Sequence, residues 1–170
     1  MTRRPVPPHA YDDTRRTRGS GPVLAVLTDS PTDLLVAAHA ADIAARTGTL
    51  LIAAATVHTT GCSVNALLHH ARNRRVRFRT VAIVARITPI LHATGVAYFR
   101  STLLVPAGTD TRLSLPTDAV SRLVDRFGAV TVVTGQPLHD PTGVLQPTPD
   151  RGRPSSVAPT NPGTERHAPI

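Results

Sequence analysis

The chain has 170 residues, of which 41% are hydrophobic and 3% aromatic, and its formal net charge at pH 7 is +8. This length allows one domain with a substantial core, built mainly from Ala, Val, Leu and Ile because aromatic residues are scarce. The single cysteine, Cys62, excludes an intramolecular disulfide. No apolar run approaches the ~18 residues that cross a bilayer, so we expect no membrane partner.

The two ends of the chain differ in composition from its middle. Residues 1–21 are rich in Arg and Pro, residues 141–170 are rich in Pro, Gly and Thr, and neither segment offers much to bury. We therefore expect two disordered tails around one domain at residues 22–140. The pair Arg3-Arg4 is not followed by a hydrophobic segment, which argues against an export signal and favours the cytoplasm.

The first predicted elements form a strand, helix and strand. Residues 23–28 are a continuous apolar run, typical of a strand covered on both faces. Ser30 suits a helix N-cap, Pro31 the first helical position, and Asp33 the acidic position of a capping box. Alanines at helical spacing continue to Gly48, a typical helix stop, and residues 50–57 form a second buried strand.

The remaining chain predicts further elements of the same kind. Helical spacing covers residues 63–77 and 80–94, with Pro89 expected to interrupt the second helix. A strand at 101–105, a helix at 115–128 and a strand at 129–134 follow. Right-handed crossovers between such strands predict an open parallel sheet of four strands with helices on both faces, in three α/β/α layers. A fifth strand, if formed, falls at residues 144–145.

Two stretches resemble the universal stress protein family, over residues 22–135. The first is the apolar strand that ends in Asp29 and Ser30, with the Ala-rich helix and the strand ending at Val57. The second is the helix and strand that end in Gly135. The resemblance implies a regulatory or protective protein of the stress response, which acts by binding ATP or AMP rather than by catalysis. In that family the last strand often pairs across a dimer; its weakness here puts a homodimer in doubt and predicts that residues 129–134 form an exposed edge.

Asp29, Val57 and Gly135 are the expected ligand-binding residues, because ligands of such sheets gather at the carboxyl ends of the strands. The resemblance places Asp29 near the nucleotide, backbone groups near Val57 at a base edge, and Gly135 at the start of a phosphate-binding loop. The alternative for Asp29 is that it only forms the turn. Leu138 and Thr148 stand where that loop has its other glycines, and Pro137 removes one amide donor. We therefore expect nucleotide binding in the family's manner to be weakened or lost.

Other chemistry finds little support in the sequence. His58, Cys62, His69 and His70 match no common zinc spacing, so we expect no metal. The sequence has one Glu, so a paired-carboxylate site would have to use Asp29 and a distant partner, and it has no Gly-x-Ser-x-Gly nucleophile elbow. A nucleotide hydrolase or transferase on the same scaffold, the alternative function, would have to order phosphates with Arg112 or the arginines of residues 72–79.

The basic run at residues 72–79 contains Arg72, Arg74, Arg75, Arg77 and Arg79. It predicts either a solvated face near a helix end or a surface for phosphate or an acidic partner. A module that binds nucleic acid or an acidic protein is thus a third function. Apart from Phe78, the run lacks aromatic residues for base stacking, and no helix-turn-helix or zinc motif frames it, which argues against nucleic acid.

Overall fold

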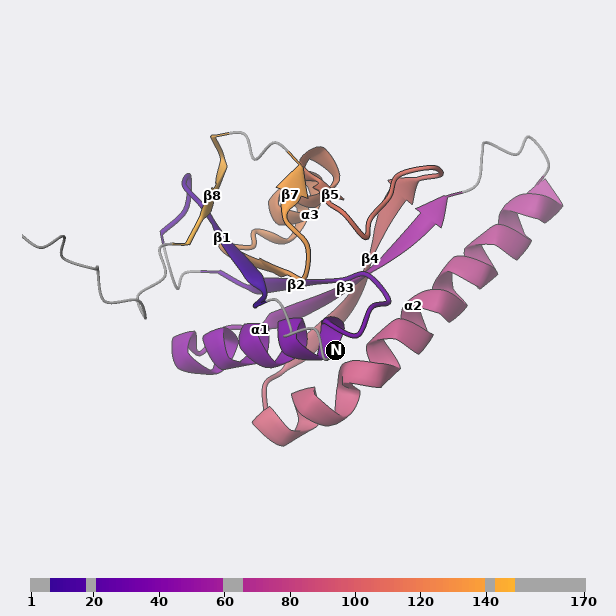
Figure 1. The fold of residues 1–170 in the computed structure, drawn as a ribbon. Helices are drawn as coiled ribbons and strands as arrows, with labels where there is room; N and C mark the ends of the chain where they lie inside the picture. The colour runs from indigo at the N-terminus through magenta and orange to yellow at the C-terminus, as the bar shows by residue number, and fades with distance from the viewer. Residues whose placement is uncertain (1–6, 18–20, 60–65, 140–142, 149–170) are drawn as a thin grey trace, which may run out of the picture.

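The fold is an open, mostly parallel sheet flanked by helices (Figure 1). The computed structural model describes residues 7–17, 21–59, 66–139 and 143–148; the expectations for Cys62 and for the outer parts of both tails lie outside these ranges. The strands of the main sheet are β1 (His9–Asp13), β2 (Val23–Leu27), β3 (Leu51–Thr59), β4 (Tyr98–Pro106), β6 (Thr131–Thr134) and β8 (Leu145–Pro147). The helices are α1 (Asp33–Thr47), α2 (Ala66–Thr94) and α3 (Thr117–Phe127), and β5 (Leu115–Pro116) pairs with β7 (Leu138–His139) in a small second sheet.

Four parallel strands form the predicted core of the sheet. The order across the sheet is β4-β3-β2-β6-β1-β8, and each pair among β4, β3, β2 and β6 is parallel. Every residue of β2 and β6 is buried, which explains why these strands read as unbroken apolar runs. The predicted α/β class and parallel core are therefore confirmed.

The helices cover both faces of the sheet, as predicted. In Figure 1, α1 and α2 lie below the sheet and α3 lies above it, together with β5 and β7. Successive residues of a strand point to opposite faces, so β3 sends Leu51, Ala53 and Ala55 to the α1 and α2 side, and Ile52 and Ala54 to the α3 side. Two separate hydrophobic clusters result, one in each layer.

Helix α1 ends where predicted and begins slightly later. Gly48 is the left-handed C-cap, with φ 65°, and its N–H points to the carbonyls of Ala44 and Ala45. The N-cap is Thr32 rather than Ser30, and it makes no side-chain capping bond. Asp33 therefore does not form the predicted capping box; it holds the turn before the helix, because its carboxylate accepts a hydrogen bond from the Ser30 N–H at 3.1 Å.

Helix α2 corrects the prediction of two helices separated near residue 79 and interrupted at Pro89. It is one helix of 29 residues with Pro89 inside it. A proline in a helix interior costs about 3 kcal/mol. Here Pro89 is exposed and flanked by the buried side chains of Ile87 and Leu91, whose packing against the sheet offsets that cost. No helix in the described part of the chain is long and apolar enough to cross a membrane.

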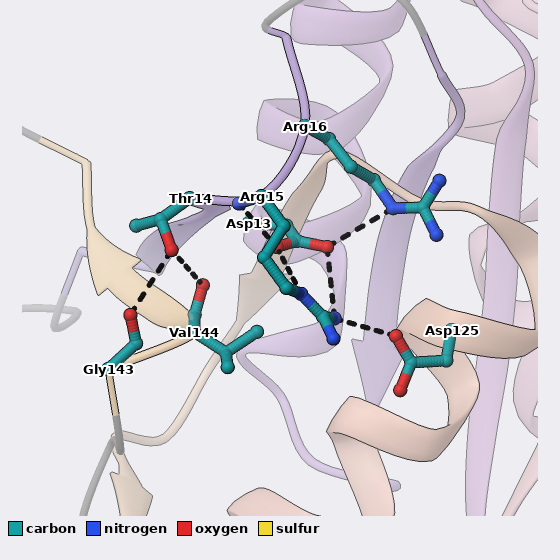
Figure 2. A network of polar contacts seen from close by, with 7 residues as sticks. All are labelled: Asp13, Thr14, Arg15, Arg16, Asp125, Gly143 and Val144. Atoms are coloured by element: carbon teal, nitrogen blue, oxygen red, sulfur yellow. Dashed lines mark hydrogen bonds and ion pairs between the residues drawn. The ribbon is translucent and has the colours of Figure 1, made fainter.

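Strand β1 overturns the expectation that residues 1–21 are disordered, at least for residues 7–17. It pairs antiparallel with β6, so β6 is not the exposed edge that we expected. Figure 2 shows how the end of β1 is held. The buried carboxylate of Asp13 accepts hydrogen bonds from Arg15 and Arg16, and Arg15 also reaches Asp125 of α3 at 2.6 Å. The sequence HAYDD shows no alternating apolar pattern, so only its pairing with β6 and the contact of Arg15 with Asp125 reveal the strand.

Strand β8 lies close to the fifth strand expected at residues 144–145, and corrects the expectation of disorder for that short segment. It pairs antiparallel with β1 instead of extending the parallel core beside β6. Thr14, just after β1, donates from its hydroxyl to the carbonyls of Gly143 and Val144 (Figure 2). The two ends of the described chain thus stabilise each other, and the outer strands of the sheet are β4 and β8.

Candidate functional site

The three positions predicted from the sequence lie at one edge of the sheet. Strand β2 ends at Leu27, two residues before Asp29, and its neighbours β3 and β6 end on either side of it. The register pairs Leu27 with Ala55 of β3 and Val26 with Thr134 of β6. Val57 and Gly135 therefore follow at the same carboxyl edge, which is where open α/β sheets bind ligands.

A cavity of about 360 Å³ opens at this edge and is lined by Asp29 and Val57 but not by Gly135. Its volume is at the lower end of the range of small-molecule sites, roughly 300–1,000 Å³. The lining residues come from the ends of β2 and β3, from α2, and from the loop after β4: Thr28, Asp29, Thr56, Val57, His58, Arg79, Ala82, Ile83, Arg86, Thr111 and Arg112. A larger hollow of about 680 Å³ lies between α2 and the beginning of β4, away from the carboxyl edge, and its only charged lining residue is Arg100.

Gly135 serves packing in this structure. A Cβ atom at this position would lie 2.6 Å from the Thr32 hydroxyl oxygen, which no real contact allows. The glycine thus lets the end of β6 approach the start of α1. Its position at the carboxyl edge was predicted correctly, while its role in binding stays a prediction.

Two backbone amides are already engaged, at the positions where the phosphate loop of the resembled family has its other glycines. The Leu138 N–H donates to the Tyr11 hydroxyl at 3.1 Å, and the Thr148 N–H donates to the Ala10 carbonyl at 2.8 Å. Both acceptor residues belong to β1, the strand that the sequence did not reveal. An anion at this edge therefore finds its donors mainly among side chains.

Asp29 sits in a left-handed backbone conformation, with φ 59°, directly after β2. Aspartate adopts this region more readily than most residues, so the sharp turn from strand to helix is compatible with it. Its carboxylate accepts a hydrogen bond from the Arg86 guanidinium of α2 at 2.6 Å. Both side chains are partly exposed, so this ion pair contributes little to stability, at most about 1 kcal/mol. Its main effect is to hold Arg86 at the mouth of the cavity.

Three arginines surround the cavity, and Asp29 is the one acidic residue in its lining. Asp29 neutralises Arg86, whereas the guanidinium groups of Arg79 and Arg112 have no acidic partner among the described residues. Three positive charges against one negative charge leave the lining two units positive. Because the walls are protein rather than water, this charge attracts an anion more strongly than it would on an open surface.

The loop that carries Arg112 is tied to the end of β3. The His58 Nε2 atom lies 2.9 Å from the Thr109 carbonyl, and because a carbonyl only accepts, this nitrogen carries the hydrogen. The backbone N–H of Arg112 in turn donates to the Asp110 carboxylate at 3.0 Å, which leaves the guanidinium group free of this bond. These bonds hold the loop that brings Arg112 into the lining of the cavity.

The floor of the cavity is the end of β3. The ladder between β2 and β3 stops at Ala55, while β3 continues beside β4 to Thr59, so Thr56 and Val57 have no partner in β2. The Thr56 hydroxyl is buried and has no hydrogen-bond partner within the described structure. A buried polar atom without a partner is rare and costly, which marks this floor as a place where a ligand group would be stabilised.

Asp33 is the buried first residue of α1, and it contacts Thr28 and Ser30 of the turn after β2. Burial raises the pKa of its carboxyl above the usual value, although hydrogen bonds from the Thr28 and Ser30 amides and the charge of Arg86 act in the opposite direction. Asp33 does not line the cavity. Its role is to hold the turn that carries Asp29.

Arg86 is the site residue that the sequence reading missed. Its signal was present: Arg79 and Arg86 are seven residues apart, so they share one face of a continuous helix. The expected break between residues 77 and 80 concealed this spacing. Within the described residues, no group of three or more His, Cys, Asp or Glu side chains could hold a metal ion.

No protein-family profile and no curated protein sequence matches the chain. Among solved structures, it is similar to a universal stress protein family member from Burkholderia pseudomallei, with 21% identity over 67% of this chain and 80% of that one and a TM-score of 0.42. It is also similar to a universal stress protein in complex with cAMP (19% identity, 66% and 74% covered, TM-score 0.46). A third is the universal stress protein from Archaeoglobus fulgidus (14% identity, 64% and 70% covered, TM-score 0.38). The likeness concerns the fold alone.

Proposed function

We propose that this protein is a regulatory binding protein of the stress response, and that its cavity at the carboxyl edge takes an adenine nucleotide, AMP or ATP, without turning it over. The observation that carries the proposal is the pair of arginines, Arg79 on α2 and Arg112 in the loop after β4, which line one cavity and whose guanidinium groups have no acidic partner among the described residues. Guanidinium groups bind phosphate oxygens through paired hydrogen bonds, so this pair suits a phosphate group.

The mode of binding differs from the one implied by the sequence resemblance. The amides of Leu138 and Thr148 are engaged within the protein, so they do not cradle the phosphates. Arginine side chains take that task here, while the free edge of β3 at Thr56 and Val57 offers backbone groups to the base. Flexible side chains lose more entropy on binding than a preformed loop, which is consistent with low affinity.

Two measurements test the proposal. Mass spectrometry of protein purified under native conditions detects a retained nucleotide, and titration calorimetry measures the Kd for AMP and ATP with adenosine as the uncharged control. Replacing Arg112 by Gln removes a charged hydrogen bond to phosphate, worth about 1.5–3 kcal/mol, and should weaken AMP binding roughly 10–150-fold. Arg122→Gln on α3 removes the same charge outside the cavity and should leave the Kd unchanged.

Asp29→Asn tests whether the Asp29 carboxylate contacts the ligand or only neutralises Arg86. If the carboxylate contacts the ligand, the variant binds more weakly. If it only neutralises Arg86, the variant frees a third arginine and binds more tightly. Absence of any retained nucleotide, together with equal affinity for AMP and adenosine, would refute the proposed function.

A further inference from the structure

Residues 70–79, in the N-terminal half of α2, have no place in the core. From residue 70 to residue 79 no side chain is buried, and Thr80 is the first buried residue of the helix in its described part. Figure 1 shows this half running past the end of β3 and away from the sheet. Helices of globular proteins owe most of their stability to a buried apolar face, so residues 70–79 lack the usual source of helix stability within this chain.

The chemistry of this segment is strongly cationic. The 29 residues of α2 contain no Asp and no Glu. Arg74, Arg75, Arg77 and Arg79 are exposed, and none of them has an acidic partner in the described structure. Like charges three and four residues apart repel each other along a helix, so the segment is destabilised unless an anion is present.

The four arginines form two rows on opposite flanks of the helix. Arg75 and Arg79 are four residues apart and share a flank, and Arg79 lines the cavity at the carboxyl edge. Arg74 and Arg77 share the other flank, which continues to Val81 in the hollow beside β4. An anionic partner that meets both rows must therefore present negative charge on two sides of the helix.

We propose that this half of α2 binds duplex DNA by lying in the major groove, where its two arginine rows contact the phosphates of the two strands. An α-helix with its side chains is about 10–12 Å across, and the major groove is about 12 Å wide. The sequence argued against nucleic acid because the run lacks stacking aromatics. In a duplex the bases stay paired and stacked, so such residues are not needed, and the structure shows that the helix predicted over these residues projects from the sheet. Since phosphate contacts carry no sequence information, the binding is independent of base sequence.

The test measures binding of the full chain to a fluorescent 20-base-pair DNA duplex by anisotropy over a series of salt concentrations. Four phosphate contacts predict a slope of log K against log salt of about −3.6. The double variant Arg74→Gln with Arg77→Gln should weaken binding at low salt and reduce the magnitude of that slope by about 2. Neither residue lines a cavity, so the result is independent of nucleotide binding.

The matched control is Arg122→Gln with Arg126→Gln on α3, which removes the same charge from the opposite face of the sheet. It should retain both affinity and slope, and thermal unfolding should show that both double variants are folded. No binding at low salt, or an equal loss in the control, would overturn the proposal. Equally tight binding to duplex RNA would exclude the major groove, because that of RNA is too narrow for a helix. Tighter binding to poly-glutamate than to the duplex would instead assign the helix to an acidic protein.

Discussion

Replacing Asp13 by Asn tests whether β1 is a true part of the fold. The Asp13 carboxylate is buried and accepts four hydrogen bonds: from the backbone N–H of Arg15 at 3.0 Å, from Arg15 Nε at 3.1 Å, from Arg15 Nη2 at 3.2 Å and from Arg16 Nε at 3.2 Å. Asparagine keeps the shape and one acceptor oxygen but loses the charge, and it presents an NH₂ group to a guanidinium.

The expected loss of unfolding free energy follows from the exposure of the partners. Hydrogen bonds to charged groups contribute about 1.5–3 kcal/mol, whereas breaking a fully buried ion pair costs 3–5 kcal/mol. The side chains of Arg15 and Arg16 are 48% and 39% exposed, so water can solvate them after the change, and Arg15 keeps Asp125. We therefore expect the lower range, about 2 kcal/mol, and a fall in Tm of roughly 4–8 °C for a chain of this length.

The pH dependence gives a second readout. Burial alone would raise the pKa of Asp13, but hydrogen bonds and charge from Arg15, with a further hydrogen bond from Arg16, outweigh it and lower the pKa below 3.8. The stabilisation is therefore present above about pH 3.8 and is lost as the pH falls through the lowered pKa of the folded state. The difference between wild type and Asp13→Asn should shrink over that acidic range.

Urea unfolding followed by circular dichroism measures both effects, with Asp42→Asn as the control. Asp42 pairs with Arg46 on the surface of α1, with both side chains more than half exposed, and should contribute less than about 0.5 kcal/mol. If Asp13→Asn were no more destabilising than Asp42→Asn, the network in Figure 2 would not stabilise the end of β1, and the reasoning above would be refuted.

Two further changes probe the carboxyl edge. Gly135→Ala should lower the free energy of unfolding in urea by about 1–3 kcal/mol, because the new Cβ atom collides with Thr32. Adding Thr32→Ala should recover most of that loss. The control Gly143→Ala places its Cβ atom in open space and should cost almost nothing. Failure of Thr32→Ala to rescue would mean that Gly135 is required for another reason. Tyr11→Phe leaves the buried Leu138 N–H without its acceptor and should cost about 1–3 kcal/mol, measured in the same way. The control is Tyr98→Phe, because the Tyr98 hydroxyl makes no hydrogen bond within the described residues. An equal cost for the two variants would contradict this prediction.

The candidate site could be predicted only in part. Asp29 and Val57 were found because strands covered on both faces have unmistakable apolar runs, and the residues after them must lie at the carboxyl edge. Arg86 was missed because its place depends on α2 continuing unbroken from Arg79, whereas the sequence suggested a break between residues 77 and 80. Whether two helical stretches join into one depends on how they pack against the sheet, and the local sequence does not contain that packing.

The sequence by itself determined the parallel core: the positions of β2, β3, β4 and β6, the helices on both faces, and the edge at which the cavity lies. These features arise from local periodicity, since burial on two faces needs a continuous apolar run and burial on one face of a helix needs a repeat of 3.6 residues. Only the tertiary structure decided that β1 and β8 extend the sheet, that the amides of Leu138 and Thr148 are occupied, and that two arginine rows project on α2. Strand β1 is stabilised by its pairing with β6 and by the contact of Arg15 with Asp125, and partners this distant in the chain leave no periodic signal.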